Sequence, residues 1–303
     1  MSTFSYVDEF AYHERVAGKA ASTIRNHRAA VTALAAWVAE RGRSEADASA
    51  ADLLGYLNTI VGRYSPDQVN NVISAFRVYF RWLLEEGLRD DNTDPAAKLK
   101  YVPVPLKPVE SLTGAECRRL VRWASGQAGR KRFGAHRSAV LAMLLLDTGL
   151  RVGEALGLHM SDLNFEEGRI LIRKTKRGDF RVVPLSLGLR RHLRRYLMRR
   201  QKRLARLEVN SEFVFIGESG NQCSVSAAEQ SFRRIGEAAG IRPVYPHLLR
   251  HTFATQSLLN GAPLPAVMRL GGWRKLTTVQ RYTYMNDAVA AEVHSRTSPL
   301  AAI

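Results

Sequence analysis

The chain has 303 residues, 46% of them hydrophobic, which is enough for two domains with buried cores and too apolar for an intrinsically disordered chain. Lysine and arginine outnumber aspartate and glutamate by 45 to 28, so the net charge is +17 and a polyanionic partner, most often nucleic acid, is expected. The two cysteines, Cys117 and Cys223, offer neither a disulfide framework nor a zinc-ligand spacing.

Two further features lead us to expect a protein that is neither exported nor membrane-spanning. The opening stretch "MSTFSYVDEFAYHER" has acids and polar residues where a signal peptide has an apolar core. The longest apolar runs, such as "AVLAMLLL", are too short to cross a bilayer. We therefore expect a soluble protein of the reducing cytosol, with no membrane partner.

Residues 1–105 predict a small helical bundle. The stretch "STIRNHRAAVTALAAWVAERG" predicts a helix capped by Ser22 or Thr23 that stops at Gly42. A shorter helix is expected near "ADLLGYLNTIV", and "SPDQVNNVISAFRVYFRWLLEEG" predicts one that starts at Ser65, with Pro66 in its first turn. The prolines of "KLKYVPVPLKPVESLT" force extended backbone, so we place a domain boundary near residue 106.

Residues 106–303 predict a second, mainly helical domain with one β interruption. The stretch "AHRSAVLAMLLLDTG" is apolar nearly all round, which is typical of a buried helix. "GRILIRKTKRGDFRVVPLS" alternates and is rich in β-branched residues, which indicates a β-hairpin. The leucine-striped, strongly basic "LRRHLRRYLMRRQKRLARLE" predicts another helix. The expected fold class is mainly α with a small antiparallel β-sheet.

Four separated segments of the second domain carry the residue types that handle a phosphodiester. They are "DTGLRVGEALGLHMSDL" with Arg151 and Glu154, the hairpin with Lys174, Lys176 and Arg177, "PHLLRHTFAT" with His247 and Arg250, and "GGWRKLTTVQRYTY" with Trp273 and Tyr282. Alone, each has a structural explanation: a surface ion pair, a solvated turn, a chance spacing, and aromatic residues of the core. Their combination in one domain favours a shared site.

Together these residue types can cut and rejoin DNA without a metal or another cofactor. Two arginines can donate to the non-bridging oxygens of one phosphate, which gain charge in the transition state. A tyrosine hydroxyl can attack the phosphorus if a histidine takes its proton, and a lysine can protonate the departing sugar oxygen.

On these motifs the chain resembles the tyrosine recombinases, also called the phage integrase family, over both of their usual domains. "TGLRVGEALGL" resembles the first-arginine motif, and the resemblance implies that Arg151 binds the scissile phosphate with support from Glu154. "KTKRGDFRVVPL" is similar to the family hairpin, which implies that Lys176, eight residues before Pro184, is the general acid, with Lys174 as the alternative.

The C-terminal motifs complete the resemblance. "PHLLRHTFAT" resembles the His-x-x-Arg motif and implies catalytic roles for His247 and Arg250. Tyr282, nine residues after Trp273, is the implied nucleophile, with Tyr284 as the alternative. The family more often has histidine at position 273; the tryptophan can still donate one N–H to a phosphate oxygen but is a poorer proton-transfer group.

The resemblance also implies an architecture and partners. Residues 1–105 would form a SAM-like domain that binds the core DNA site, residues 106–303 the catalytic domain, and the two a C-shaped clamp around duplex DNA. Expected DNA contacts are Arg25, Arg28, Arg77, Arg81, Lys174 and Arg177. The implied assembly is a homotetramer, or a heterotetramer with a paralogue, on an inverted-repeat core site, with an accessory DNA-bending or directionality protein as a further partner.

The tail and the start of the chain give two finer expectations. "NDAVAAEVHSRTSPL" fits a short helix capped by Asp287 that docks into a neighbouring subunit, or else a mobile terminus. The early start of the helical domain favours an Xer-like, Cre-like or transposon-resolvase type over the lambda-integrase type. The expected location is the cytoplasm of a bacterial or phage-infected cell, in association with the nucleoid.

Three alternatives stay open at this point. A type IB topoisomerase uses nearly the same residues to relax supercoils, although the spacing from Trp273 to Tyr282 and the compact N-terminal domain favour a recombinase. A DNA-binding regulator would need no Tyr282 hydroxyl. A metal-dependent nuclease would be inactivated by EDTA, whereas the reaction expected here would not.

Overall fold

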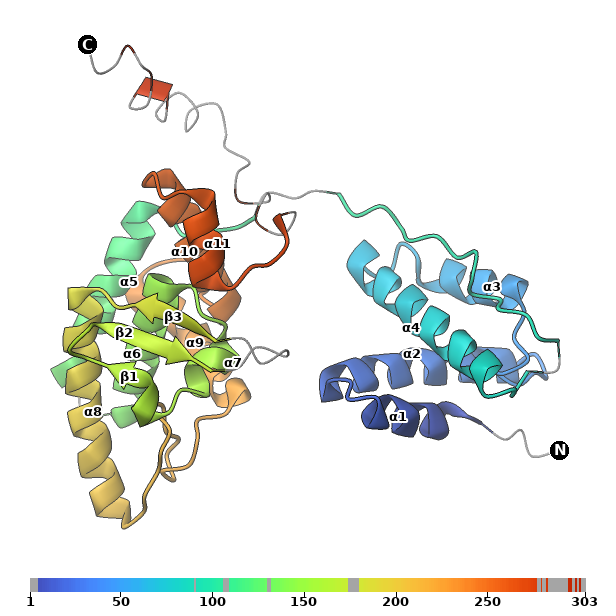
Figure 1. Ribbon diagram of the computed structural model, residues 1–303, viewed down its shortest axis with the longest axis horizontal. Coiled ribbons are helices and arrows are strands. Elements are labelled where there is room, and N and C mark those ends of the chain that lie inside the picture. The colour runs from blue at the N-terminus through green and yellow to red at the C-terminus, as the bar shows by residue number, and fades with distance from the viewer. Residues whose placement is uncertain are drawn as a thin grey trace. The chain divides into compact units, whose positions relative to one another are not determined.

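The computed structural model describes residues 5–89, 91–105, 109–129, 132–173 and 180–276, together with 279, 282, 294–295, 298 and 300. The chain divides into two compact units, Met1–Leu106 and Lys107–Ile303. Helices dominate both units, and the sheet of the second is small and antiparallel, which confirms the expected fold class (Figure 1). Within the described ranges, no helix combines the length and the apolar character needed to cross a bilayer.

The described part of the first unit is a helical bundle. Its helices are α1 (Val7–Val16), α2 (Ala21–Ala39), α3 (Ala50–Ile60) and α4 (Pro66–Glu85). α2 packs against α1 and α4 and also contacts α3. Their apolar stripes meet in one core, whose fully buried members include Phe10, Leu34, Leu53, Phe76 and Phe80. Each such side chain contributes roughly 1.5–3 kcal/mol by leaving water, so packing stabilises these helices more than their propensities do.

The starts of two helices in this unit show when local sequence signals are enough to predict where a helix begins. α4 begins as predicted: the Ser65 hydroxyl accepts from the N–H of Gln68 at 3.3 Å, and Gln68 Oε1 accepts from the N–H of Ser65 at 3.0 Å. The predicted cap of α2 at Ser22 or Thr23 is wrong, because that helix starts at Ala21 with Ala20 as its N-cap. Alanine favours helix, and the packing of α2 on its neighbours extends it beyond the polar residues.

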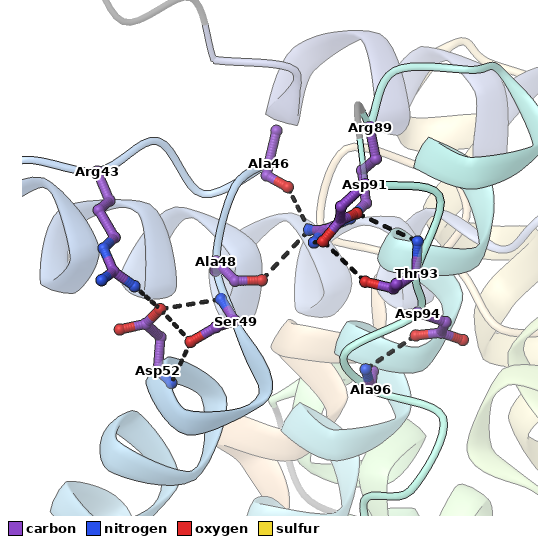
Figure 2. A network of polar contacts seen from close by, with 10 residues as sticks. All are labelled: Arg43, Ala46, Ala48, Ser49, Asp52, Arg89, Asp91, Thr93, Asp94 and Ala96. Atoms are coloured by element: carbon purple, nitrogen blue, oxygen red, sulfur yellow. Dashed lines mark hydrogen bonds and ion pairs between the residues drawn. The ribbon is translucent and has the colours of Figure 1, made fainter.

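A buried arginine joins two loops of the first unit (Figure 2). The Nη1 of Arg89 donates to the carbonyls of Ala46 and, at 3.2 Å, Ala48, in the loop before α3. Its Nε and Nη2 donate to Asp91 at 3.0 and 2.8 Å. Hydrogen bonds from Arg89 and Thr93 hold the pKa of Asp91 well below its usual range. The guanidinium thus connects the loop between α2 and α3 to the segment after α4.

Replacing Arg89 with methionine should destabilise the first unit by about 2–4 kcal/mol, because two buried carbonyls lose their donor. The check is amide hydrogen exchange in α2 and α4 of the full chain, where protection should fall. Arg43→Met is the matched control: Arg43 belongs to the same loop network but its side chain is 52% exposed, so its loss should cost less than about 1 kcal/mol. Equal protection in both variants would contradict the role given to Arg89.

The second unit is built around one buried helix. Its helices are α5 (Gly114–Gly126), α6 (Phe133–Thr148), α7 (Val152–Leu156), α8 (Leu187–Leu207), α9 (Val225–Ala239), α10 (Pro246–Leu259) and α11 (Leu264–Gly271), with 3-10 turns at Gln127–Gly129 and Met160–Asp162. α6 contacts α5, α8, α9 and α10, and most of its residues are buried. The prediction of a buried helix here is confirmed, and its neighbours on several sides explain why it has no polar face.

The sheet consists of β1 (Leu163–Asn164), β2 (Arg169–Ile172) and β3 (Arg181–Pro184), in that spatial order and antiparallel. Ile170 lies opposite Val183, and both are buried against the core. The two strands of the predicted hairpin are therefore confirmed. Its tip, residues 174–179, lies outside the described residues. β3 also contacts α11, which brings Arg181 to the C-terminal end of that helix.

Candidate active site

The first arginine follows a tight turn at the end of α6. The helix ends at Gly149, whose φ of 65° is left-handed. A Cβ at this position would lie 2.3 Å from the ring of Phe253, so the close approach of α10 requires glycine as well. Two residues on, Arg151 is the N-cap of α7, and its side chain is 51% exposed. The turn thus presents Arg151 at the surface beside α10.

Glu154 fixes this arginine, as the spacing predicts, but it has a second and more buried partner. Its Oε2 accepts from the N–H of Arg151 at 2.8 Å, and its Oε1 accepts from Arg151 Nη1 at 3.1 Å. Arg181 donates to the same two oxygens at 3.0 and 2.8 Å, and its Nε donates to the carbonyl of Leu270 at 3.0 Å. Burial would raise the pKa of Glu154, but the hydrogen bonds from Arg181 and Arg151 lower it.

Replacing Arg181 with methionine should destabilise the second unit by about 2–3 kcal/mol at about pH 7, because a buried carboxylate loses its main partner. In the wild type, the lowered pKa of Glu154 gives stability that is present above the unfolded value of 4.5 and is lost as the pH falls. In the variant, burial prevails and raises that pKa, so its stability falls as the pH rises through 4.5 and above. The penalty should therefore shrink towards about pH 4.

Urea unfolding of both proteins at these two pH values measures the effect. Arg169→Met is the control, since Arg169 lies on the neighbouring strand with its side chain 49% exposed and should cost less than about 1 kcal/mol. A penalty for Arg181→Met that does not change with pH would show that Glu154 is not the group affected.

The second arginine is almost fully buried. Arg250, on α10, is 2% exposed, and its Nη1 donates to the carbonyl of Gly149. Burial, reinforced by the charge of Arg151, lowers the pKa of Arg250 to about 10. Its Nη2 has no hydrogen-bond partner in the described part of the chain. A buried, charged donor without an acceptor is costly, so this position is suited to an incoming anion.

Trp273 lies under this guanidinium. The centroid of its ring is 4.0 Å from the Cζ of Arg250, and on another side the ring centroid is 5.6 Å from that of Tyr282. A Cβ on Gly271 would approach the tryptophan ring to 1.9 Å, which explains the glycine two residues before it. Trp273 therefore holds both the buried arginine and the tyrosine in place through cation–π and ring contacts.

The predicted nucleophile lies in the same cluster. Tyr282 is 7% exposed, and its hydroxyl is 2.5 Å from Nδ1 of His251. His251 in turn contacts the exposed His247 edge to face, with ring centroids 4.3 Å apart. His251 was not predicted. The signal was present, because residues four apart on a helix share a face, so a histidine four residues after His247 falls on the same side of α10.

The structure therefore brings together most of the residues that the sequence singled out. Those that lie around one point of the second unit are Arg151, Glu154, His247, Arg250, Trp273 and Tyr282. Arg181 and His251 join them without having been predicted. Lys174, Lys176 and Arg177, like the alternative nucleophile Tyr284, lie outside the described residues.

The expected DNA contacts of the first unit differ in their environments. Arg25, Arg28 and Arg81 are exposed, although Arg28 forms an ion pair with Asp8 at 2.8 Å. Arg77 is only partly exposed, and its Nη2 donates to the carbonyl of Ala97 at 3.1 Å. An exposed arginine can move to a phosphate at little cost, whereas Arg77 would first have to leave its present partner.

Comparison with known proteins finds two family profiles and several relatives that match this chain. The phage integrase family profile matches residues 110–288, and the N-terminal SAM-like domain of phage integrases matches residues 7–90. Tyrosine recombinase XerA of Pyrococcus furiosus is 31% identical over 91% of this chain and 88% of its own length. Tyrosine recombinase XerD of Rhizobium meliloti is 32% identical over 94% and 91%, respectively.

Solved structures show the same fold. The crystal structure of XerA recombinase aligns over 97% of this chain and 98% of its own, with 26% identity and a TM-score of 0.55. XerH site-specific recombinase, in a post-cleavage complex with a palindromic difH substrate, aligns over 82% and 72% with 21% identity and a TM-score of 0.68. With both family profiles matched and its relatives covered nearly end to end, this chain belongs to the phage integrase family and is a tyrosine recombinase.

Proposed function

We propose that this protein recombines DNA at specific sites through a 3′-phosphotyrosyl bond to Tyr282, so that strands are exchanged between two sites in integration, excision or resolution. One observation carries the proposal. A buried guanidinium with an unused donor, Arg250 Nη2, shares a ring contact through Trp273 with a tyrosine whose hydroxyl is already hydrogen-bonded. An anion held by the first group would lie next to the nucleophilic oxygen of the second.

The phosphate would be held by both arginines. Arg250 offers its buried Nη2 to one non-bridging oxygen, and the exposed Arg151 reaches the other from the N-terminus of α7. Glu154 orients Arg151, and the Trp273 N–H donates to the phosphate as well. Charge builds on the non-bridging oxygens as the fifth bond to phosphorus forms, so these contacts stabilise the transition state more than the ground state.

The reaction is a transesterification. The Tyr282 oxygen attacks phosphorus, the bond from phosphorus to the 5′ oxygen breaks, and Lys176 protonates the departing oxygen, with Lys174 as the alternative. The phosphotyrosyl bond conserves the energy of the broken linkage, so a 5′-hydroxyl from a second strand can reverse the step. In this scheme the arginines and the lysine supply the positive charge, and neither a metal nor ATP takes part.

The assembly follows from the chemistry. Exchange between two duplexes needs four cleavage events, so we propose a homotetramer, or a heterotetramer with a paralogue, on duplex DNA with an inverted-repeat core site. Residues 1–105 would bind that site through Arg25, Arg28, Arg77 and Arg81 and would form a C-shaped clamp with the catalytic residues 106–303. The tail after Met285 would dock into a neighbouring chain. An accessory DNA-bending or directionality protein and a cytoplasmic, nucleoid-associated location complete the proposal.

Covalent capture from a pool of random DNA sites tests this function. The protein is incubated in EDTA with nicked duplexes whose inverted-repeat arms are randomised, and DNA that stays attached after denaturation in SDS is sequenced. The expected product carries protein on a 3′-phosphate and has a free 5′-hydroxyl, and the recovered arms share a consensus. A regulator would give no attached DNA, and a metal-dependent nuclease would be silenced by EDTA.

A second assay distinguishes recombination from topoisomerase activity. Two plasmids that carry the recovered consensus should exchange flanking sequences, and plasmids without it should keep their supercoils. If plasmids with and without the consensus were all relaxed and no flanking sequences were exchanged, the protein would instead be a type IB topoisomerase.

A further inference from the structure

The hydroxyl of Tyr282 has a specific partner on α10. It lies 2.5 Å from Nδ1 of His251, a close hydrogen-bond contact between an oxygen and a ring nitrogen. The rings are tilted by 50° with centroids 5.3 Å apart, so the contact is made by the edge of the imidazole. Tyr282 is buried and His251 partly so, which limits the access of water as a competing proton acceptor.

The other histidine of this helix contacts the His251 ring. His247 lies one turn earlier and is exposed, and its ring meets His251 at 73°, edge to face. His247 thus packs against the His251 ring, while Nδ1 of His251 lies within hydrogen-bond distance of the tyrosine oxygen. Geometry is the first requirement for a general base, and this contact already meets it.

We propose that His251 is a catalytic residue that accepts the proton of Tyr282. With its proton on Nε2, the neutral imidazole offers the Nδ1 lone pair to the hydroxyl. As the tyrosine oxygen forms its bond to phosphorus, its O–H bond breaks and the proton moves to Nδ1. The electron pair of the breaking phosphorus–oxygen bond stays on the 5′ oxygen, which takes its proton from the general acid. His247 is left to contact the phosphate.

The surroundings of His251 connect this transfer to the arrival of DNA. Arg250 precedes it in the chain. Burial, helped by the charges of Arg151 and Arg181, lowers the pKa of Arg250. Glu154 acts in the opposite direction, so the three arginines outnumber the one carboxylate at this site. A further positive charge, the imidazolium, is unfavourable there until another anion enters. The scissile phosphate brings that anion, so proton transfer would follow phosphate binding. In rejoining, the imidazolium returns its proton to the tyrosine oxygen as the phosphotyrosyl bond breaks.

This proposal rests on the proposed function, and its test uses the nicked duplexes recovered by covalent capture. First-order cleavage rates are measured for the wild type, His251→Ala and His251→Asn. Asparagine can keep a hydrogen bond to the tyrosine oxygen but cannot take its proton. Both variants should lose on the order of 10²–10⁴-fold in rate while their DNA affinities and thermal midpoints stay near those of the wild type.

Chemical rescue separates proton transfer from packing. Added imidazole should restore His251→Ala by at least about tenfold, because it can enter the vacated space and take the proton, and it should not accelerate the wild type or His247→Ala. A rate within about threefold of the wild type for either His251 variant, or a loss that imidazole does not restore, would overturn the role of His251. Failure of the wild type to form any covalent complex would instead overturn the proposed function.

Discussion

Replacing Arg250 with methionine should lower the first-order rate of DNA cleavage by ~10³–10⁵-fold, the range measured for arginines that stabilise a transferring phosphoryl group. Stability should fall by no more than about 1–2 kcal/mol, because the buried carbonyl of Gly149 loses its donor while the cost of burying a guanidinium whose Nη2 lacks a partner within the described residues is removed. Suicide-duplex cleavage and urea unfolding measure the two effects. The substitution would thus remove most of the cleavage activity while changing the free energy of unfolding little.

Two further variants serve as comparisons for Arg250→Met. Arg250→Lys keeps the charge but loses the planar fork of donors, so its rate should lie between those of the wild type and Arg250→Met. Arg233→Met changes an exposed arginine of α9 and should leave the rate unchanged. If Arg250→Met cleaved DNA normally, or lost activity only because it unfolded, the buried guanidinium would not be the phosphate-binding group.

Replacing Tyr282 with phenylalanine should abolish the covalent complex, with cleavage reduced by at least ~10⁴-fold, while DNA affinity stays within about twofold. The ring and its packing against Trp273 remain, so the expected loss of stability is about 1 kcal/mol, the value of one hydrogen bond to His251. Gel-shift binding and SDS-resistant complex formation on the same duplex give both quantities.

Tyr284→Phe is the matched control for this change. Tyr284 lies two residues further along, does not fit the spacing from Trp273, and should be dispensable for cleavage. Loss of the covalent complex in Tyr284→Phe, with Tyr282→Phe still active, would move the nucleophile to the alternative tyrosine.

Much of the fold could be predicted because the relevant signals are local. Ser65 and Pro66 mark the start of α4, and alternating β-branched residues mark β2 and β3. The buried character of α6 shows in its lack of a polar face. The failed cap of α2 has the opposite cause, since the polar residues Ser22 and Thr23 lie inside a helix whose start depends on packing against other helices.

The residues of the site also fall into those that sequence spacing predicts and those that only the folded chain brings together. Arg151 with Glu154, and His247 with Arg250, are pairs three residues apart on helices, so sequence spacing alone places them together. Arg181 could not be predicted, because its contacts run from β3 to α7 and to the end of α11 and exist only in the folded chain. His251 lay within reach of spacing arguments, but its contact with Tyr282 again depends on tertiary structure.

The most direct measurement is cleavage of a duplex in which a methyl group replaces one non-bridging oxygen of the scissile phosphate. This change removes the negative charge that Arg151 and Arg250 are proposed to share. The rate advantage of the wild type over Arg151→Ala and over Arg250→Ala should then shrink by at least about tenfold for both variants. An undiminished advantage for either variant would show that this arginine does not bind the phosphate attacked by Tyr282.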